Sequence, residues 1–164
     1  MLYDTNHVDT ASDTPFSGSE KFVPQKAITA SLVEETDRLG FLFKMIGNDV
    51  ASIQFESYVY SLMSKLSSHQ YLGGYWDFLS LSNGGFYMRL QGDSTYTITS
   101  PNGHQYECSV ETASIVVNLF ALNWMTQHPS LKKAYVEAFA AHYYHLKDFA
   151  LEHKDVSLIL DLIV

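Results

Sequence analysis

The sequence predicts an α+β fold in a single domain, with a four-stranded antiparallel β-meander packed against several α-helices. Apolar residues follow a helical period up to about residue 67, alternate with polar residues from 75 to 109, and then return to a helical period. Two turn sequences, Asn83-Gly84 and Pro101-Asn102-Gly103, divide the alternating region into hairpins. A chain of 164 residues is long enough to bury a substantial core.

The N-terminal part is expected to be a loose arm followed by two helices. Residues 1–25 are polar and end near Pro24, so the folded domain is expected to span 26–164. Residues 29–46 are predicted to be helical, with Gly47 as the stop and one apolar side formed by Leu32, Leu39, Leu42, Phe43 and Ile46. Residues 49–67 form the clearest predicted helix, which Asn48 or Asp49 can cap and whose apolar stripe is Val50, Ile53, Tyr58, Leu62, Met63 and Leu66.

The first predicted hairpin joins residues 75–81 to 86–90. Asn-Gly favours a two-residue turn, because both central residues of a type I′ turn need positive φ. That register pairs Leu81 with Phe86 and Leu79 with Met88, and it gathers the apolar residues on one face, whereas a three-residue loop would divide them. Two consequences are expected: Asp77 falls on the apolar face and needs a hydrogen-bond partner or an edge position, and an aromatic patch forms on the outer face from Trp76, Phe78 and Tyr87.

The second predicted hairpin has a three-residue loop at Pro101-Asn102-Gly103, which pairs Ile98 with Tyr106 and Tyr96 with Cys108. Ser109 is expected to cap a helix that runs to about Gln127 and is apolar nearly all round, as a buried central helix is. Pro129 is expected to sit in the first turn of a helix that ends near His153, and Asp155 to cap a short last helix through Leu162. The apolar tail at 158–164 could pair with a second copy in a homodimer.

The charge balance disfavours direct nucleic-acid binding, since the chain has 18 acidic and 10 basic residues and a net charge of −8. An acidic protein can instead imitate DNA. Here lysines and arginines offset more than half of the carboxylates, and the tightest acidic cluster is only Glu34, Glu35 and Asp37. A solvated acidic surface is the simpler interpretation, and the DNA mimic is kept as an alternative. One cysteine, no secretory signal and no membrane-length apolar stretch predict a cytoplasmic protein.

No motif makes a positive case for an enzyme, a metal site or a cofactor. HExxH, GxSxG, GxGxxG and GxxxxGK[ST] are all absent. His142, His145 and Asp148 lie on one predicted helix and are the residues that a small hydrolase or metal-dependent enzyme would use. Histidines on a helix surface or at the edge of the core are the simpler interpretation. We therefore predict no catalytic residues, no metal ligands and no cofactor.

Residues 73–88, GGYWDFLSLSNGGFYM, contain more aromatic rings than a hairpin needs. Bulky rings on an exposed sheet face are typical of a partner surface, and the equally weighted alternative is that they pack beneath the 29–46 helix or the N-terminal arm. If the surface is a binding site, the candidate partner-binding residues are Trp76, Asp77, Phe78, Asn83, Gly84, Gly85, Tyr87 and Arg89.

The same stretch closely resembles the signature of the ArdB/KlcA antirestriction family, in GGYWDF at 73–78 and LSNGGFYM at 81–88. The similarity covers most of residues 36–161, including Phe41-Leu42, Gly47 and the SVETASIVVNLFAL segment at 109–122. The sequence departs from the family pattern at three places, one of which is Ala113-Ser114 in place of Ala-Gly. Phe43 occupies a position where the family usually has proline, and Arg89-Leu90 replaces Ala-Pro.

The resemblance implies an α+β protein of a plasmid or mobile element that protects incoming DNA from type I restriction enzymes in the bacterial cytoplasm. It implies no cofactor. The implied partner is a type I restriction-modification enzyme, contacted directly or through a host factor. We expect non-enzymatic inhibition through a shaped surface around Trp76, Asp77, Asn83 and Tyr87.

Overall fold

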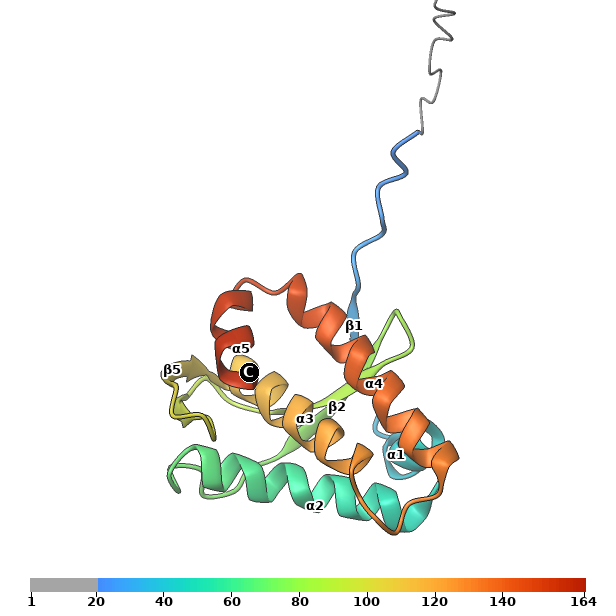
Figure 1. The fold of residues 1–164 in the computed structure, drawn as a ribbon, viewed down its shortest axis with the longest axis horizontal. Helices are drawn as coiled ribbons and strands as arrows, with labels where there is room; N and C mark the ends of the chain where they lie inside the picture. Colours follow the sequence, from blue (N-terminus) through green and yellow to red (C-terminus); the bar gives the residue numbers. More distant parts are fainter. Residues whose placement is uncertain (1–20) are drawn as a thin grey trace, which may run out of the picture.

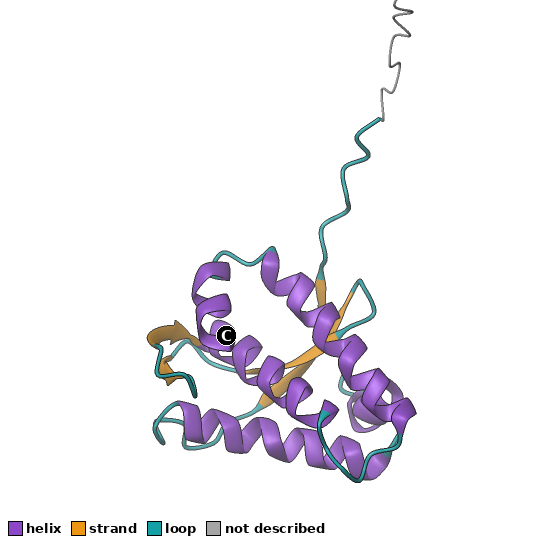
Figure 2. Ribbon diagram, viewed as in Figure 1, coloured by secondary structure: helices purple, strands orange, loops and turns teal. Residues whose placement is uncertain are grey.

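The computed structural model describes residues 21–164 and has an α+β architecture, as predicted (Figures 1 and 2). In chain order the elements are β1 (Ala30–Leu32), α1 (Arg38–Ile46), α2 (Asp49–Leu66), β2 (Trp76–Leu81), β3 (Phe86–Leu90), β4 (Thr95–Thr99), β5 (Gln105–Ser109), α3 (Val110–Thr126), α4 (Lys133–Leu151) and α5 (Val156–Ile163). Residues 21–27 are exposed and lead away from the body of the protein (Figure 1). The predicted arm at 1–25 otherwise lies outside the described residues.

The predicted four-stranded meander is wrong, because the strands form two separate sheets. One sheet has the antiparallel order β1-β2-β3, and the other pairs β4 with β5. The outer edge of β3 is covered by α3 instead of β4. Asn118 accepts a hydrogen bond from the backbone N–H of Met88 at 2.9 Å and donates one to its carbonyl at 2.7 Å, while Ser114 accepts one from the N–H of Leu90 at 3.1 Å. Side chains of α3 therefore make the backbone hydrogen bonds at the edge of β3 that a fourth strand would have made.

The predicted helix at 29–46 is wrong in its first third. Residues 30–32 form β1, which pairs with β2, and the helix begins only at Arg38. Leu32, Leu39 and Phe43, expected on the apolar side, are exposed. Leu42 and Ile46, also expected there, are buried together with Phe41. Residues 30–32 form a strand because they pair with β2, almost fifty residues later in the chain. A local pattern of apolar residues carries no information about such a distant partner.

The second helix agrees with its prediction in extent and capping. The side chain of Asn48 accepts a hydrogen bond from the N–H of Ala51 at 2.8 Å. Its predicted buried stripe is only partly right, since Val50 and Ile53 are 64% and 63% exposed. The buried face instead follows a four-residue spacing through Ala51, Phe55, Val59 and Met63.

The C-terminal half follows the sequence-based expectation closely. Tyr96 pairs with Cys108 and Ile98 with Tyr106, as predicted for the second hairpin. Ser109 caps α3, a buried helix at the centre of the fold (Figure 1). The prediction that Pro129 sits in the first turn of the next helix is wrong, because that helix begins at Lys133, four residues later. In α5, Ile159 and Leu162 are buried against the same chain, so packing within one copy accounts for most of the apolar tail.

Candidate functional site

The hairpin of β2 and β3 has a different register from the predicted one. Leu79 lies opposite Tyr87 and Phe78 lies opposite Met88. The N–H of Leu81 donates to the carbonyl of Gly85 at 2.9 Å, which leaves a three-residue loop at 82–84 in place of the two-residue turn. Leu79 and Met88 therefore lie on opposite faces of the sheet, and the expectation of one apolar and one outer face is wrong.

Both faces of this sheet are covered, which removes the reason for sorting apolar residues to one side. One face carries Trp76, Phe78, Phe86 and Met88, and its rings meet α1 and α2: the ring centroids of Phe78 and Phe41 are 5.6 Å apart, those of Phe86 and Phe55 5.6 Å, and those of Trp76 and Tyr60 5.7 Å. The other face carries Tyr87, whose ring centroid is 5.6 Å from that of Phe149 on α4. The predicted aromatic patch of Trp76, Phe78 and Tyr87 does not exist as a surface, because all three side chains are buried. The equally weighted alternative, that the rings pack beneath the helix before Gly47, is confirmed for Phe78, which stacks on Phe41 of α1.

The turn residues among the candidates attach the hairpin to α4. Asn83 donates from its side-chain amide to the backbone carbonyl of His145 at 2.9 Å and accepts from the N–H of Gly85 at 3.1 Å. Gly84 has φ +93°, a conformation that favours glycine, as expected for this position. Gly85 is buried against α4, where an added Cβ would lie 2.5 Å from the Cβ of His145. These three residues explain how the hairpin docks.

The polar candidates meet at the opposite end of the hairpin. Asp77 is buried and accepts a hydrogen bond from Gln91 at 2.9 Å, and its other oxygen lies 3.5 Å from the guanidinium of Arg89. The prediction that Asp77 needs a partner is confirmed, and the residue opposite it on β3 is Arg89. The Asp77 side chain is 11% exposed and that of Arg89 is 34% exposed, so this pair reaches the surface.

A polar hollow of about 660 Å³ opens over this pair, between the end of β3, the start of β4 and the beginning of α3. Its charged lining residues are Asp77, Arg89, Asp93, Glu111 and Lys154. The hydroxyl of Tyr87 donates to Glu111 at 3.3 Å, and the other oxygen of Glu111 lies 3.9 Å from Nε2 of His153. Burial, followed by the charge of Glu111, raises the pKa of Tyr87, so its hydroxyl remains a donor. We take this hollow as the candidate site.

The histidines and the cysteine have structural surroundings. His142 is buried, with Nε2 2.7 Å from the carbonyl of Met45 and its ring edge-on to Phe86 at 4.9 Å. Burial lowers the pKa of His142, which favours the neutral imidazole. Asp148 is exposed on the same helix. Burial raises the pKa of Cys108 to about 11, so it is a protonated thiol near neutral pH.

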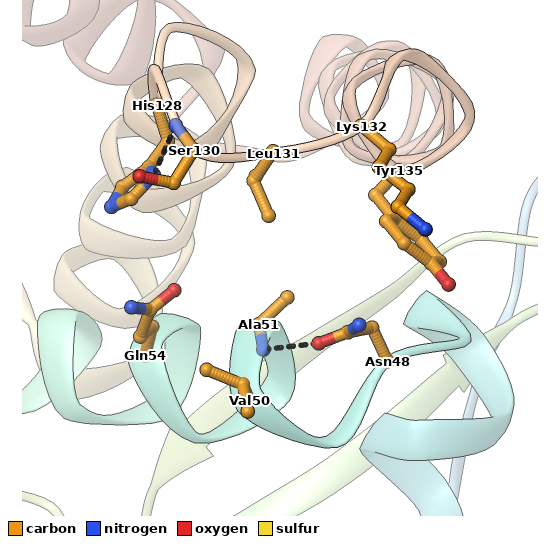
Figure 3. A pocket seen from close by; sticks show the side chains of 9 residues that line it. All are labelled: Asn48, Val50, Ala51, Gln54, His128, Ser130, Leu131, Lys132 and Tyr135. Atoms are coloured by element: carbon orange, nitrogen blue, oxygen red, sulfur yellow. Dashed lines mark hydrogen bonds between the residues drawn. The ribbon is translucent and has the colours of Figure 1, made fainter.

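A smaller hollow of about 250 Å³ lies between the start of α2 and the loop before α4 (Figure 3). Its polar groups serve local structure: Asn48 caps α2, and Nδ1 of His128 accepts from the N–H of Ser130 at 3.3 Å. Among residues 21–164, no group of three or more histidine, cysteine or acidic side chains is placed to hold a metal ion. Within the same residues, no helix is both long and apolar enough to cross a membrane.

Sequence reasoning did not identify Glu111, which lines the hollow, or His153, which lies beside Glu111. It also did not identify Ser114 and Asn118, which cover the edge of the neighbouring strand β3. A signal for two of them exists, since Ser114 and Asn118 are polar residues four apart in a helix that is otherwise apolar nearly all round. Polar side chains at helical spacing in a buried helix require partners, and an unpaired strand edge supplies them. Glu111 and His153 come from distant parts of the chain and carry no such local mark.

Comparison with known proteins supports one family. The antirestriction protein family matches residues 69–163. Antirestriction protein KlcA of Escherichia coli is 38% identical over 134 residues, which covers 80% of this chain and 90% of that protein. Putative antirestriction protein YubI of Escherichia coli strain K12 is 37% identical over 91 residues, 56% of this chain and 62% of its own length.

The fold agrees with the same assignment. A solved structure matches with a TM-score of 0.77 and 34% identity over 87% of this chain and 99% of its own. It comes from work that describes the KlcA and ArdB proteins as having a novel fold and antirestriction activity against type I DNA restriction systems in vivo but not in vitro. By sequence and by fold, the chain belongs to the antirestriction protein family.

Proposed function

We propose that this protein relieves the restriction of incoming DNA by type I restriction-modification enzymes in the bacterial cytoplasm. The observation that carries the proposal is the match to KlcA over 90% of its length, together with the match to a structure of the KlcA and ArdB proteins, described as active against type I systems. We propose that the protein inhibits without catalysing a reaction. In support of this, His142, the candidate catalytic histidine, is buried, hydrogen-bonded to the carbonyl of Met45 and packed on Phe86.

Activity in vivo but not in vitro, described for the KlcA and ArdB proteins, favours a mechanism that needs another component of the cell. A protein that simply occupied the DNA-binding groove of the enzyme would also act in a purified reaction. We therefore propose that the contact with the restriction enzyme is made through, or together with, a host factor.

The alternative of a DNA mimic receives little support from the distribution of charge. Asp4, Asp9, Asp13 and Glu20 precede the described residues, so residues 21–164 carry fourteen acidic and ten basic side chains and a net charge of only −4. Duplex DNA presents about one negative charge per 1.7 Å of its axis. In the candidate site, Arg89 and Lys154 lie among the carboxylates and interrupt any phosphate-like array.

We assign the contact surface to the polar hollow beside Asp77. Asp77 belongs to the stretch that resembles the family signature, whereas Arg89 replaces the usual alanine of the family. We therefore propose that Asp77 and Glu111 contact the binding partner. Arg89 pairs with Asp77 in this chain and is not part of the family pattern. Trp76, Phe78 and Tyr87 are buried inside the fold and support the strands that carry this surface, whereas the turn residues lie at the other end of the hairpin and attach it to α4.

The test is the plating of unmodified phage on a strain that carries a type I restriction system, with and without this protein. We expect plating to rise towards the level of modified phage, and to stay unchanged on a strain with a type II system. Purified protein added to a type I cleavage reaction is expected to leave cleavage intact. An unchanged plating efficiency at confirmed expression of folded protein would reject the proposal.

The assignment of the surface has a separate test. Asp77→Asn keeps an acceptor for Gln91 but removes the charge, and it is expected to lose protection while the protein remains folded. Glu137→Gln makes the same chemical change on α4, in an exposed pair with Lys133, and serves as the matched control. Full protection by folded Asp77→Asn protein would reject the polar hollow as the contact surface.

A further inference from the structure

The outer edge of β1 presents backbone groups that no described residue pairs. The N–H of Ser82 donates to the carbonyl of Thr29 and the N–H of Val33 donates to the carbonyl of Phe78, both at 2.9 Å. Thr29, Ser31 and Val33 therefore direct their backbone groups towards β2. Residues alternate along a strand, so the N–H and C=O groups of Ala30 and Leu32 point away from β2. Within residues 21–164, β2 is the only strand beside β1.

A groove of about 530 Å³ lies next to this edge, between β1 and α1. Its apolar wall includes Phe41, which is buried, and Val33, which packs against the core. Gly40 lines the groove from the first turn of α1, and a Cβ at this position would meet no atom within 4 Å. A glycine inside a helix costs about 1 kcal/mol relative to alanine, and here it leaves the groove open.

The charges at the groove favour a basic occupant. Glu34 and Asp37 line it and Lys44 is the only basic residue there. Both acids belong to the tightest acidic cluster of the sequence, which the candidate site does not use. A lysine or arginine side chain could place its aliphatic stem along Phe41 and its charged end beside these carboxylates.

We propose that β1 and α1 form a peptide-binding site that takes an extended segment of a partner protein as an added strand, with a lysine or arginine side chain in the groove. Backbone hydrogen bonds from Ala30 and Leu32 hold the segment, and alternate side chains of an added strand face α1. This goes beyond the proposed function, since it names a binding mode that does not depend on the polar hollow or on restriction.

Nuclear magnetic resonance of the full chain tests the free edge directly. In the free protein, the amides of Ala30 and Leu32 are expected to exchange with solvent faster than that of Val33, which donates to Phe78. The probe is a short peptide of alternating threonine and valine with a central lysine. Its addition is expected to slow exchange at Ala30 and Leu32 and to shift the signals of Gly40 and Lys44.

Control peptides separate the two parts of the proposal. Replacing the lysine with glutamate is expected to weaken binding at least tenfold, and N-methylation of alternate amides is expected to abolish it, because it removes the donors that pair with the edge. Equal affinity for the lysine and glutamate peptides would overturn the assignment to basic segments. Slow exchange at Ala30 and Leu32 in the free chain would show that the edge is already paired and would overturn the site.

A variant pair keeps the result separate from folding. Gly40→Leu fills the groove with a good helix former and is expected to abolish peptide binding at unchanged or higher thermal stability. Leu39→Gln changes the neighbouring position, which is fully exposed and outside the groove, and is expected to bind the peptide normally. Undiminished binding by folded Gly40→Leu protein would reject the groove. Because these measurements use purified protein and peptide, they can fail while phage protection stands, and the reverse.

Discussion

Asn83 donates a hydrogen bond from its side-chain amide to the backbone carbonyl of His145 at 2.9 Å, across 62 positions of the sequence. This bond ties the turn of the β2–β3 hairpin to the middle of α4, and Gly85 allows the close approach. The Asn-Gly-Gly sequence thus does more than reverse the chain. It docks one face of the sheet against α4 and thereby fixes where the other end of the hairpin, with Asp77, reaches the surface.

The first prediction concerns this docking. Gly85→Ala should lower the free energy of unfolding by about 1–3 kcal/mol, because its Cβ would lie 2.5 Å from the Cβ of His145 and the backbones must move apart. Urea unfolding measures the change. The matched control is Gly40→Ala, whose Cβ meets open space in a helix and which should raise stability by about 0.5–1 kcal/mol. Equal stability of Gly85→Ala and the parent protein would contradict the tight contact.

The two hairpins show what a local pattern can and cannot predict. In the second hairpin, the Pro-Asn-Gly loop and the alternation of apolar residues favour the same register, and the prediction of Ile98 opposite Tyr106 is confirmed. In the first hairpin, the predicted register rests on Asn83-Gly84 as a two-residue turn and, as the deciding criterion, on the gathering of apolar residues on one face. Because α1, α2 and α4 cover both faces, that criterion has no force, and the contacts of Asn83 and Gly85 with α4 favour the three-residue loop.

The candidate site was predictable only in part, for a related reason. The need of Asp77 for a polar partner follows from its position among apolar residues, and the structure supplies Gln91 and Arg89. The prediction that Trp76 and Tyr87 share a face depended on the wrong register, and both rings are buried because helices cover both faces of the sheet. Strand β1 escaped prediction because three residues gain their structure from pairing with β2, far along the chain.

A second prediction concerns the hydrogen bonds between the side chains of α3 and the backbone of β3. Asn118→Ala leaves the buried N–H and C=O of Met88 without partners, at a cost of about 1–3 kcal/mol for each group. Chemical denaturation should show this loss. Asn123→Ala, an exposed position on the same helix, should change stability by no more than about 0.5 kcal/mol. If Asn118→Ala were as stable as Asn123→Ala, α3 would not be the cover of this strand edge.

A third prediction separates core from contact at Trp76. The side chain is 2% exposed, its indole donates to the hydroxyl of Tyr71 at 2.9 Å, and its ring lies against Tyr60. Trp76→Ala should lower the free energy of unfolding by about 3–5 kcal/mol. It should lower phage protection only in proportion to the loss of folded protein. Trp76→Phe keeps most of the packing and should retain protection. A fully stable Trp76→Ala protein without protection would make Trp76 a contact residue and would contradict its burial.

A fourth prediction follows from the lowered pKa of His142, which burial causes first and the neighbouring His145 reinforces. The unfolded chain has the ordinary value of about 6.5, so in the range between the two pKa values it binds more protons than the folded protein. The contribution of His142 to the free energy of unfolding is therefore complete above about pH 6.5. It is lost as the pH falls towards the pKa of His142 in the folded protein. The measurement compares the parent with His142→Gln, which retains a donor for the carbonyl of Met45, so that the groups common to both proteins contribute equally. The free energy of unfolding of the parent, followed by urea titration at a series of pH values, should fall more steeply below about pH 6.5 than that of the variant. Parallel curves for the two proteins would show that His142 is protonated equally in the folded and unfolded states.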